Sequence, residues 1–197
     1  MNINKFFILA SNSKSRKSIL KKLNLSFKTT KHNCNELLYK RKFIKLRFSP
    51  RKISLELAKK KAESIKIKNK LIIGSDTVIS FKGNIIKKAK NKIEATEKIK
   101  ELSGKKHVII SSVAAYYNKK LIWCCSDSTL VKIRKLSNLE IKQYLKLCGS
   151  DVFSAVGCYQ IEKRGPIIIE EIKGDFFNVM GLPLFRFLTL LSKTNLN

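Results

Sequence analysis

The segment LIIGSDTVISF, residues 71–81, places one carboxylate, that of Asp76, inside a mostly apolar run. Consecutive apolar and β-branched residues predict a buried strand, and we expect Gly74-Ser75-Asp76 to interrupt it. A loop at that point would bring Asp76 to the edge of a sheet, where active sites of α/β proteins lie. There the carboxylate can accept a proton from water or bind a divalent metal. An Asp that caps a turn is the common alternative.

Sequence patterns on both sides of this segment predict alternating strands and helices. Strands are expected at residues 5–10, 25–31, 84–87, 107–117 and 121–133, and helices at 16–25, 54–65, 91–104, 137–149 and 182–191. Ser54 is expected to cap its helix, and residues 32–50 are expected to form a long polar connection. The prediction is one α/β (α+β) domain over residues 1–197, with a mixed, twisted central sheet flanked by helices.

The composition favours a folded chain, since 44% of the 197 residues are apolar. The longest apolar candidate, residues 179–191, is too short for a membrane span. The run FFILA near the start is shorter than the core of a secretory signal. The five cysteines form no CxxC pair, which fits reduced, mostly buried thiols. We therefore expect a cytoplasmic protein without a membrane partner.

The formal net charge of +28 has two interpretations. Nucleic-acid or polyphosphate binding would use such a charge through phosphate contacts. The alternative is a drift in composition, because lysine, isoleucine and asparagine are abundant throughout the chain. No aromatic RNA-binding strand motif is present. We favour drift together with a local phosphate site over nucleic acid as a partner, an alternative that the high positive charge leaves open.

Residues 11–17, SNSKSRK, follow the first strand and precede a helix. Hydroxyls, amide groups and cations in such a place can hold an anion. Arg16 lies in this loop, Lys61 flanks the inward face of its helix, and Lys87 and Lys88 are expected on the strand that begins at residue 84. If these cations converge, they suit a triphosphate. For Lys61, a side chain that extends from the helix flank to water is the commoner arrangement.

Several other sites are not supported by the sequence. P-loop, dinucleotide-binding and serine-hydrolase motifs are absent. His32 and His107 lie far apart, which makes a zinc site improbable, whereas a carboxylate-bound Mg²⁺ remains open. The acids in IEEIKGDFFNVMGLPL (169–184) are explained by a strand end, a turn and a helix start.

Taken together, six motifs resemble the Maf family of nucleoside triphosphate pyrophosphatases. They are LASNSKSRKSIL, LAKKKAES, GSDTVIS, LSGKKH, GCYQIEKRG and IEEIKGDFFNVMGLPL, in family order over about residues 6–190. The ordered set is specific, although each motif is weak alone. The resemblance implies a cleft beside a mixed sheet, hydrolysis of the α–β phosphate bond of nucleoside triphosphates, a divalent metal (Mg²⁺ or Mn²⁺), and often a homodimer. It also suggests a role in removing non-standard nucleotides.

The resemblance also implies roles for individual residues. Asp76 matches the catalytic acid of the S-D-T-V motif, which accepts a proton from the attacking water. Glu36 matches a family acid and, with Asp76, is a candidate metal ligand. The substrate-binding residues that we expect are Ser11, Ser13, Arg16, Lys61 and Lys88.

The base preference stays open because the sequence signals conflict. Lys14 replaces the proline of the opening loop, and Ser15 stands where family members often carry Arg or Trp. Thr77 resembles the branch that acts on dTTP and UTP, whereas Glu162 resembles the branch that acts on 7-methyl-GTP. We therefore treat Ser15, Thr77 and Glu162 as specificity residues. A basic nucleic-acid-binding protein and a cell-division regulator on the same fold are the alternative functions.

Overall fold

The computed structural model describes residues 5–193, which include a seven-stranded sheet in the order β2-β1-β3-β5-β6-β7, with β4 paired to β3. The strands are β1 (Phe7–Leu9), β2 (Phe27–Thr29), β3 (Leu71–Phe81), β4 (Asn84–Ile85), β5 (Lys106–Tyr117), β6 (Lys120–Ile133) and β7 (Ile169–Lys173). β1 is parallel to β2 and β3, whereas the other pairs are antiparallel. The predicted mixed α/β sheet is confirmed.

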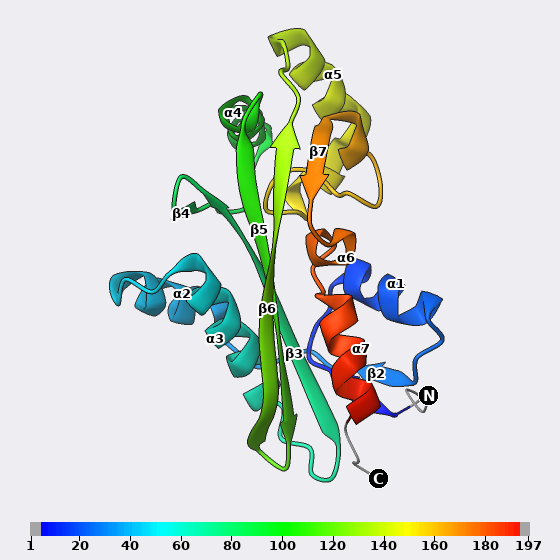
Figure 1. The fold of residues 1–197 in the computed structure, drawn as a ribbon. Helices are drawn as coiled ribbons and strands as arrows, with labels where there is room; N and C mark the ends of the chain where they lie inside the picture. The colour runs from blue at the N-terminus through cyan, green and yellow to red at the C-terminus, as the bar shows by residue number, and fades with distance from the viewer. Residues whose placement is uncertain (1–4, 194–197) are drawn as a thin grey trace.

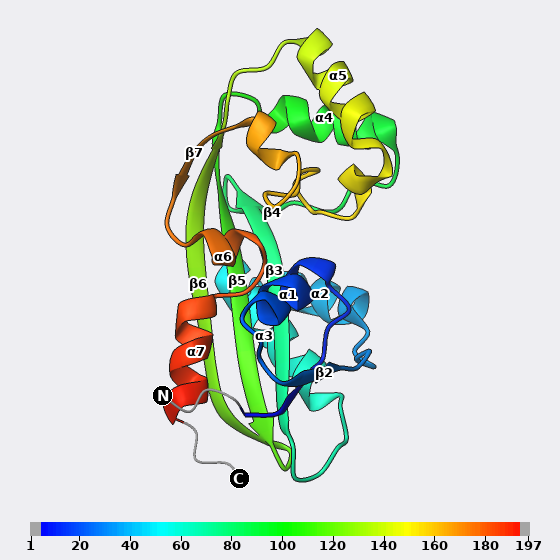
Figure 2. The same cartoon turned by 90° about the vertical axis from the view of Figure 1, so that its right-hand side faces the viewer.

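The helices lie in two groups along this sheet. They are α1 (Lys14–Lys22), α2 (Glu36–Lys45), α3 (Pro50–Glu63), α4 (Lys92–Leu102), α5 (Asn138–Cys148), α6 (Phe176–Val179) and α7 (Leu184–Lys193), with short 3-10 helices at Gly149–Phe153 and Gly165–Ile167. β5 and β6 run the length of the molecule, with α4 and α5 near one end and α1, α2, α3 and α7 towards the other (Figures 1 and 2).

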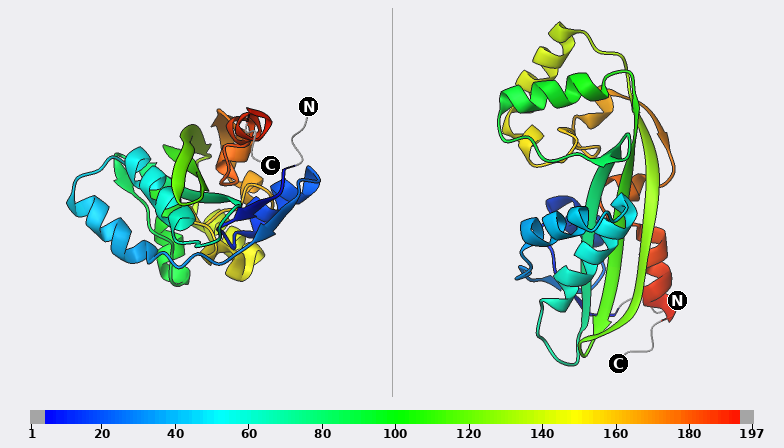
Figure 3. Two further views of the ribbon diagram at one scale, coloured as in Figure 1. Left: turned by 90° about the horizontal axis from the view of Figure 1, so that it is seen from below. Right: turned by 90° about the vertical axis from the view of Figure 1, so that its left-hand side faces the viewer.

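Separate apolar clusters hold these groups to the sheet. Phe7, Ile19 and Phe187 belong to the cluster that packs α1 and α7 on one face, whereas Ala58 and Ala62 of α3 pack on the other face. Figure 3 shows α3 and α7 on opposite sides of the long strands. A further cluster contains residues of α4 and α5 at the far end. The half of the sheet next to α1, α3 and α7 is therefore covered on both faces, which allows polar side chains of β3 to be buried.

The predicted interruption at Gly74-Ser75-Asp76 is wrong, because β3 runs through it without a break. Its antiparallel register with β5 is continuous from Leu71 to Ser80 and pairs Asp76 with Ser112. Gly74 allows close contact with α3, since a Cβ there would lie 2.1 Å from the Ala58 carbonyl oxygen. The glycine therefore makes room for a helix and does not mark a turn. Asp76 consequently lies in the middle of the strand.

The predicted polar connection over residues 32–50 is also wrong, because α2 occupies much of it. Asn35 caps this helix by accepting a hydrogen bond from the Leu38 amide (3.1 Å). Phe43 is buried against α3, and this tertiary contact stabilises a helix whose sequence is polar and basic. Ser49, not Ser54, caps α3; Ser54 is buried within the helix and donates to the Asp76 carbonyl oxygen (3.1 Å).

Other local predictions have mixed outcomes. The Ser137–Glu140 capping box of α5 is confirmed. Lys87 and Lys88 follow β4 and are not on the strand. All five cysteines are free, but only Cys158 is buried, so the expectation of mostly buried thiols is wrong. Within residues 5–193, no helix is both long and apolar enough to cross a membrane.

Candidate active site

A buried ion pair joins β3 to α3. Lys61 Nζ lies 2.7 Å from Asp76 Oδ1, and each residue is 5% exposed. The alternative for Lys61, a side chain that reaches water at the helix flank, is therefore wrong. Burying two charges costs solvation energy that only a close pair offsets. The pair thus keeps a carboxylate inside the sheet without leaving it unpartnered.

Glu36 at the start of α2 adds a second carboxylate to this pair. Its Oε1 lies 3.1 Å from the same Lys61 Nζ and 3.0 Å from His32 Nε2. Burial raises the Glu36 pKa, but the charge of Lys61 and smaller effects of His32 and Arg16 outweigh it, so the pKa is lowered. Burial is the main cause of the lowered His32 pKa. We call Asp76, Lys61, Glu36 and Arg16 the Asp76 cluster.

Arg16 in the first turn of α1 is oriented by neutral oxygen atoms. Its Nε donates to the Gly181 carbonyl (2.7 Å), Nη1 to Ser11 Oγ (3.1 Å) and Nη2 to Thr77 Oγ1 (2.8 Å). A guanidinium has five N–H groups, so two remain for another ligand. Burial lowers the Arg16 pKa, and the charges of Asp76 and Glu36 oppose that shift. The opening loop therefore presents a fixed cation.

The other predicted residues of the opening loop have different roles in the structure. Ser11 is buried and accepts from Arg16, whereas Ser13 caps α1 by accepting from the Arg16 amide (3.4 Å). Ser15 donates to the carboxylate of Glu162, which links α1 to the turn before Gly165. Lys88 is exposed and makes no hydrogen bond or ion pair within the described part of the chain. The structure thus does not bring Lys88 into the Asp76 cluster.

A buried polar network beneath the cluster was not predicted. Thr77 Oγ1 lies 2.9 Å from Ser111 Oγ, and Ser111 donates to the Asn178 carbonyl (2.7 Å). Ser75 donates to the Gly181 carbonyl (3.1 Å), where φ is +104° and an added Cβ would meet Thr77 at 3.1 Å. The adjacent Ser111 and Ser112 inside the apolar segment HVIISSVAAYY are the sequence feature that could have indicated it. The network holds the strand and the Met-Gly-Leu-Pro segment together.

The carboxylates suit a metal that arrives with its substrate. No group of three or more His, Cys, Asp and Glu residues within 5–193 is arranged to hold a metal ion. Asp76 and Glu36 nevertheless converge on one ammonium group. Mg²⁺ commonly uses one or two carboxylates together with water and substrate phosphates. The donor set therefore fits such an ion, although it does not form a closed protein site.

Two cavities of the described residues lie away from the Asp76 cluster. One is lined by Tyr144 and Cys158 among others, and the second by Thr30 and Ser64 among others; none of the residues of the Asp76 cluster lines either one. The Asp76 cluster, unlike either cavity, contains the buried ion pair that chemistry on a phosphate requires. The substrate cleft expected from the sequence stays a prediction.

Comparisons with known proteins agree with these motifs. The sequence model of the Maf-like protein family matches residues 6–194. A 7-methyl-GTP pyrophosphatase of Bartonella quintana is 38% identical over 187 residues, covering 93% of each chain. A nucleoside triphosphate pyrophosphatase of Pelagibacter ubique is 36% identical, covering 91% of this chain and 93% of that protein. A dTTP/UTP pyrophosphatase of Thermosipho melanesiensis is also 36% identical, covering 93% and 95%.

Proposed function

The chain belongs to the family of Maf-like proteins, and from that premise we propose that it is a nucleoside triphosphate pyrophosphatase. The reaction hydrolyses the α–β phosphate bond and releases a nucleoside monophosphate and pyrophosphate. The observation that carries the proposal is the buried Asp76–Lys61 pair beside the fixed guanidinium of Arg16. It combines a proton acceptor with cations for phosphate, the two requirements of phosphoryl transfer.

In the proposed mechanism Asp76 acts as the general base. Water adds its oxygen to the phosphorus on one side of the α–β bridge, the bond from that phosphorus to the bridging oxygen breaks, and the water proton passes to the Asp76 carboxylate. Lys61 orients this carboxylate through its 2.7 Å contact. The two unused N–H groups of Arg16 bind phosphate oxygen atoms and offset the developing charge.

Asp76 and Glu36 would hold the divalent metal, Mg²⁺ or Mn²⁺. When bound, such an ion neutralises phosphate charge and polarises the phosphoryl oxygen atoms. Lys61 contacts both carboxylates and so holds them close together before substrate binds.

For the base, the geometry favours Glu162 over Thr77 as the residue that reads it. The Thr77 hydroxyl is occupied by Arg16 and Ser111, so it is committed to the protein. Glu162 is exposed, and Ser15 is its one hydrogen-bond partner among the described residues. A carboxylate accepts hydrogen bonds from the N–H edge of guanine and attracts the positive ring of 7-methylguanine. We therefore propose a guanine-type substrate, as in the relative from Bartonella quintana.

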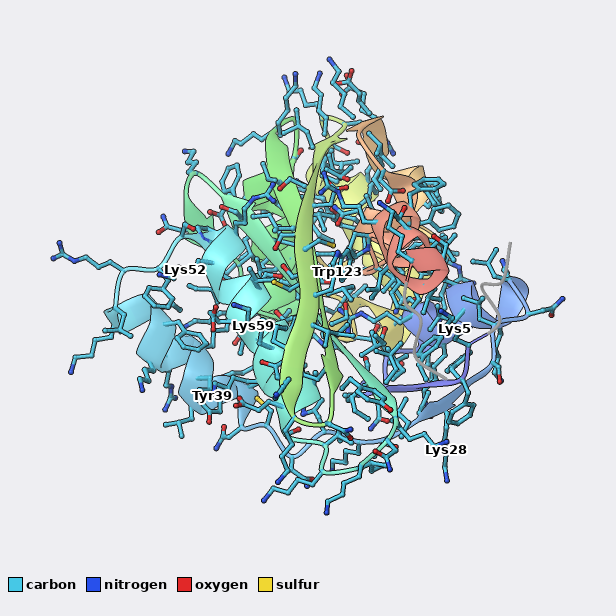
Figure 4. All side chains as sticks on the ribbon, turned by 60° about the horizontal axis from the view of Figure 1, so that its bottom comes forward. Lys5, Lys28, Tyr39, Lys52, Lys59 and Trp123 are labelled. Atoms are coloured by element: carbon cyan, nitrogen blue, oxygen red, sulfur yellow. The ribbon has the colours of Figure 1, made fainter. Side chains whose placement is uncertain are left out.

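The cations do not favour nucleic-acid binding as the main function. In Figure 4 the labelled Lys28 and Lys52 lie on different sides of the molecule, and other long basic side chains extend around it. A nucleic-acid site would gather them on one face. A cytoplasmic homodimer remains part of the proposal because of the family resemblance.

The proposal is tested by measuring pyrophosphate released from 7-methyl-GTP, GTP, dTTP and UTP with Mg²⁺ or Mn²⁺. We expect release from the guanine-type substrates and its loss in Asp76→Asn by about a thousand-fold. Asp127→Asn is the matched control, because this carboxylate pairs with Arg186 outside the cluster (3.6 Å). Release from none of the four by a folded protein would overturn the proposed function. Preference for dTTP and UTP would overturn the assignment of Glu162 as the base-reading residue.

A further inference from the structure

Lys40 on α2 lies on the same helix face as Glu36 and the buried Phe43. It follows Glu36 by four positions and precedes Phe43 by three, so all three share one face. Phe43 is buried against α3, and Glu36 contacts Lys61 at 3.1 Å. Lys40 itself is half-buried, whereas Arg41 and Lys42 on the same helix are exposed. Lys40 therefore lies on the side of α2 that packs against α3.

Lys40 has no counter-ion of its own in the part of the chain that the structure describes. Within residues 5–193 the Lys40 side chain makes no hydrogen bond and no ion pair. The 12 ion pairs of this part of the chain are all formed by other residues. Burial lowers the Lys40 pKa, and the charges of Asp76 and Glu36 act against that effect. A half-buried cation near two carboxylates that are already paired with Lys61 is available to an incoming anion.

The charges around Asp76 leave an excess of positive charge. Lys40 lies one helical turn from Glu36 on α2, and Glu36 contacts Lys61 at 3.1 Å. Arg16 adds a third cation, whereas Asp76 and Glu36 supply the two negative charges. Three cations beside two carboxylates suit a ligand that carries several negative charges, such as a polyphosphate chain.

We propose that Lys40 is a further substrate-binding residue, whose ammonium group binds the phosphate chain of the nucleotide from the α2 side. This inference rests on the proposed function and adds a contact that the family motifs do not assign. Lysine suits this role because its compact charge can follow a flexible phosphate chain. Lys40 then neutralises phosphate charge, the role that the family resemblance implies for Lys88, which the structure leaves exposed.

The test compares Lys40→Gln with Lys42→Gln, a matched change at an exposed lysine on the same helix. Calorimetric titration with inorganic tripolyphosphate measures phosphate binding without a base and without turnover. We expect Lys40→Gln to weaken binding about tenfold and Lys42→Gln to change it less than about twofold. Lys40→Arg should restore most of the affinity, and thermal melting confirms that each variant folds.

Two results overturn the inference: equal affinities of Lys40→Gln and Lys42→Gln, or no binding of tripolyphosphate by the unmodified protein. The proposed function fails separately if the protein binds tripolyphosphate through Lys40 but releases no pyrophosphate from any nucleotide. Where pyrophosphate is released, Lys40→Gln should raise KM more than it lowers kcat, because the contact acts on binding.

Discussion

The Asp76 cluster and the pair formed by His107 and Tyr159 are two buried polar sites in different halves of the sheet. In the Asp76 cluster, Asp76 and Glu36 both contact the Lys61 ammonium. In the other site, His107 Nε2 contacts the Tyr159 hydroxyl, and His107 Nδ1 is buried without a hydrogen-bond partner among residues 5–193. One site is built from opposite charges and the other from neutral groups.

The difference shows how neighbours determine the charge of a buried group. Burial alone lowers the His107 pKa to about 4, so this imidazole is neutral at pH 7. Glu36 is only partly covered, with 47% of its side chain exposed, and the nearby cations outweigh the effect of desolvation and lower its pKa. Charged groups that chemistry requires can therefore be kept inside the protein only where counter-charges surround them.

Among the variants that test this difference between the two sites, Lys61→Met should change the free energy of unfolding most. It leaves the Asp76 carboxylate without its close cation, and we expect the free energy of unfolding to fall by about 3–5 kcal/mol. Denaturant unfolding measures this change. Lys60→Met is the control, because Lys60 pairs with Glu63 on the exposed side of α3 and should cost about 0.5 kcal/mol or less.

A double variant sharpens the same prediction. Adding Asp76→Asn to Lys61→Met removes the unpaired charge and should recover at least half of the lost stability. If the double variant loses as much unfolding free energy as the sum of the losses in Lys61→Met and Asp76→Asn, the two residues do not act as a pair.

The second prediction concerns the pH dependence of stability at His107. Its folded pKa of about 4 lies below the unfolded value of 6.5. Between these values the unfolded chain binds a proton that the folded chain does not, so stability falls as the pH is lowered and is constant above 6.5. The loss at pH 4 should be about 3 kcal/mol. His107→Gln should remove this difference in denaturant unfolding at pH 4.5 and pH 7.5, and an unchanged pH dependence would contradict it.

Tyr159→Phe should have a smaller effect on the same site. Tyr159 is buried and its hydroxyl contacts His107 Nε2, so its loss leaves that nitrogen unpartnered. We expect the unfolding free energy to fall by about 1–2 kcal/mol, with pyrophosphate release retained. A large loss of activity in a folded variant would contradict the separation of the two buried sites.

Ser15→Ala should change stability least. Ser15 donates to Glu162 near the surface, and an exposed hydrogen bond of this kind contributes about 0.5 kcal/mol or less. Because the change frees the Glu162 carboxylate, we expect a shift in the ratio of kcat/KM between 7-methyl-GTP and dTTP. An unchanged ratio would argue that this pair does not contact the base.

The sequence by itself determined most of the local structure and the family. Apolar periodicity predicted the long strands β5 and β6, and the Ser137–Glu140 box marked the start of α5. These patterns depend on residues a few positions apart, so a single sequence carries them. Each family motif is likewise a short run of neighbouring residues, so the ordered motifs identified the family from the sequence alone.

Only the tertiary structure decided where the chemical groups lie. Asp76 was expected on a loop but lies inside β3. Lys61 was expected to reach water at a helix flank, but it is buried, with its Nζ 2.7 Å from Asp76 Oδ1. The bond between Arg16 and Gly181 joins residues that are 165 positions apart. Such contacts depend on how α3 packs on β3 and how the last segment returns to the first helix. Packing of that kind sums over many distant residues, and no local pattern encodes it.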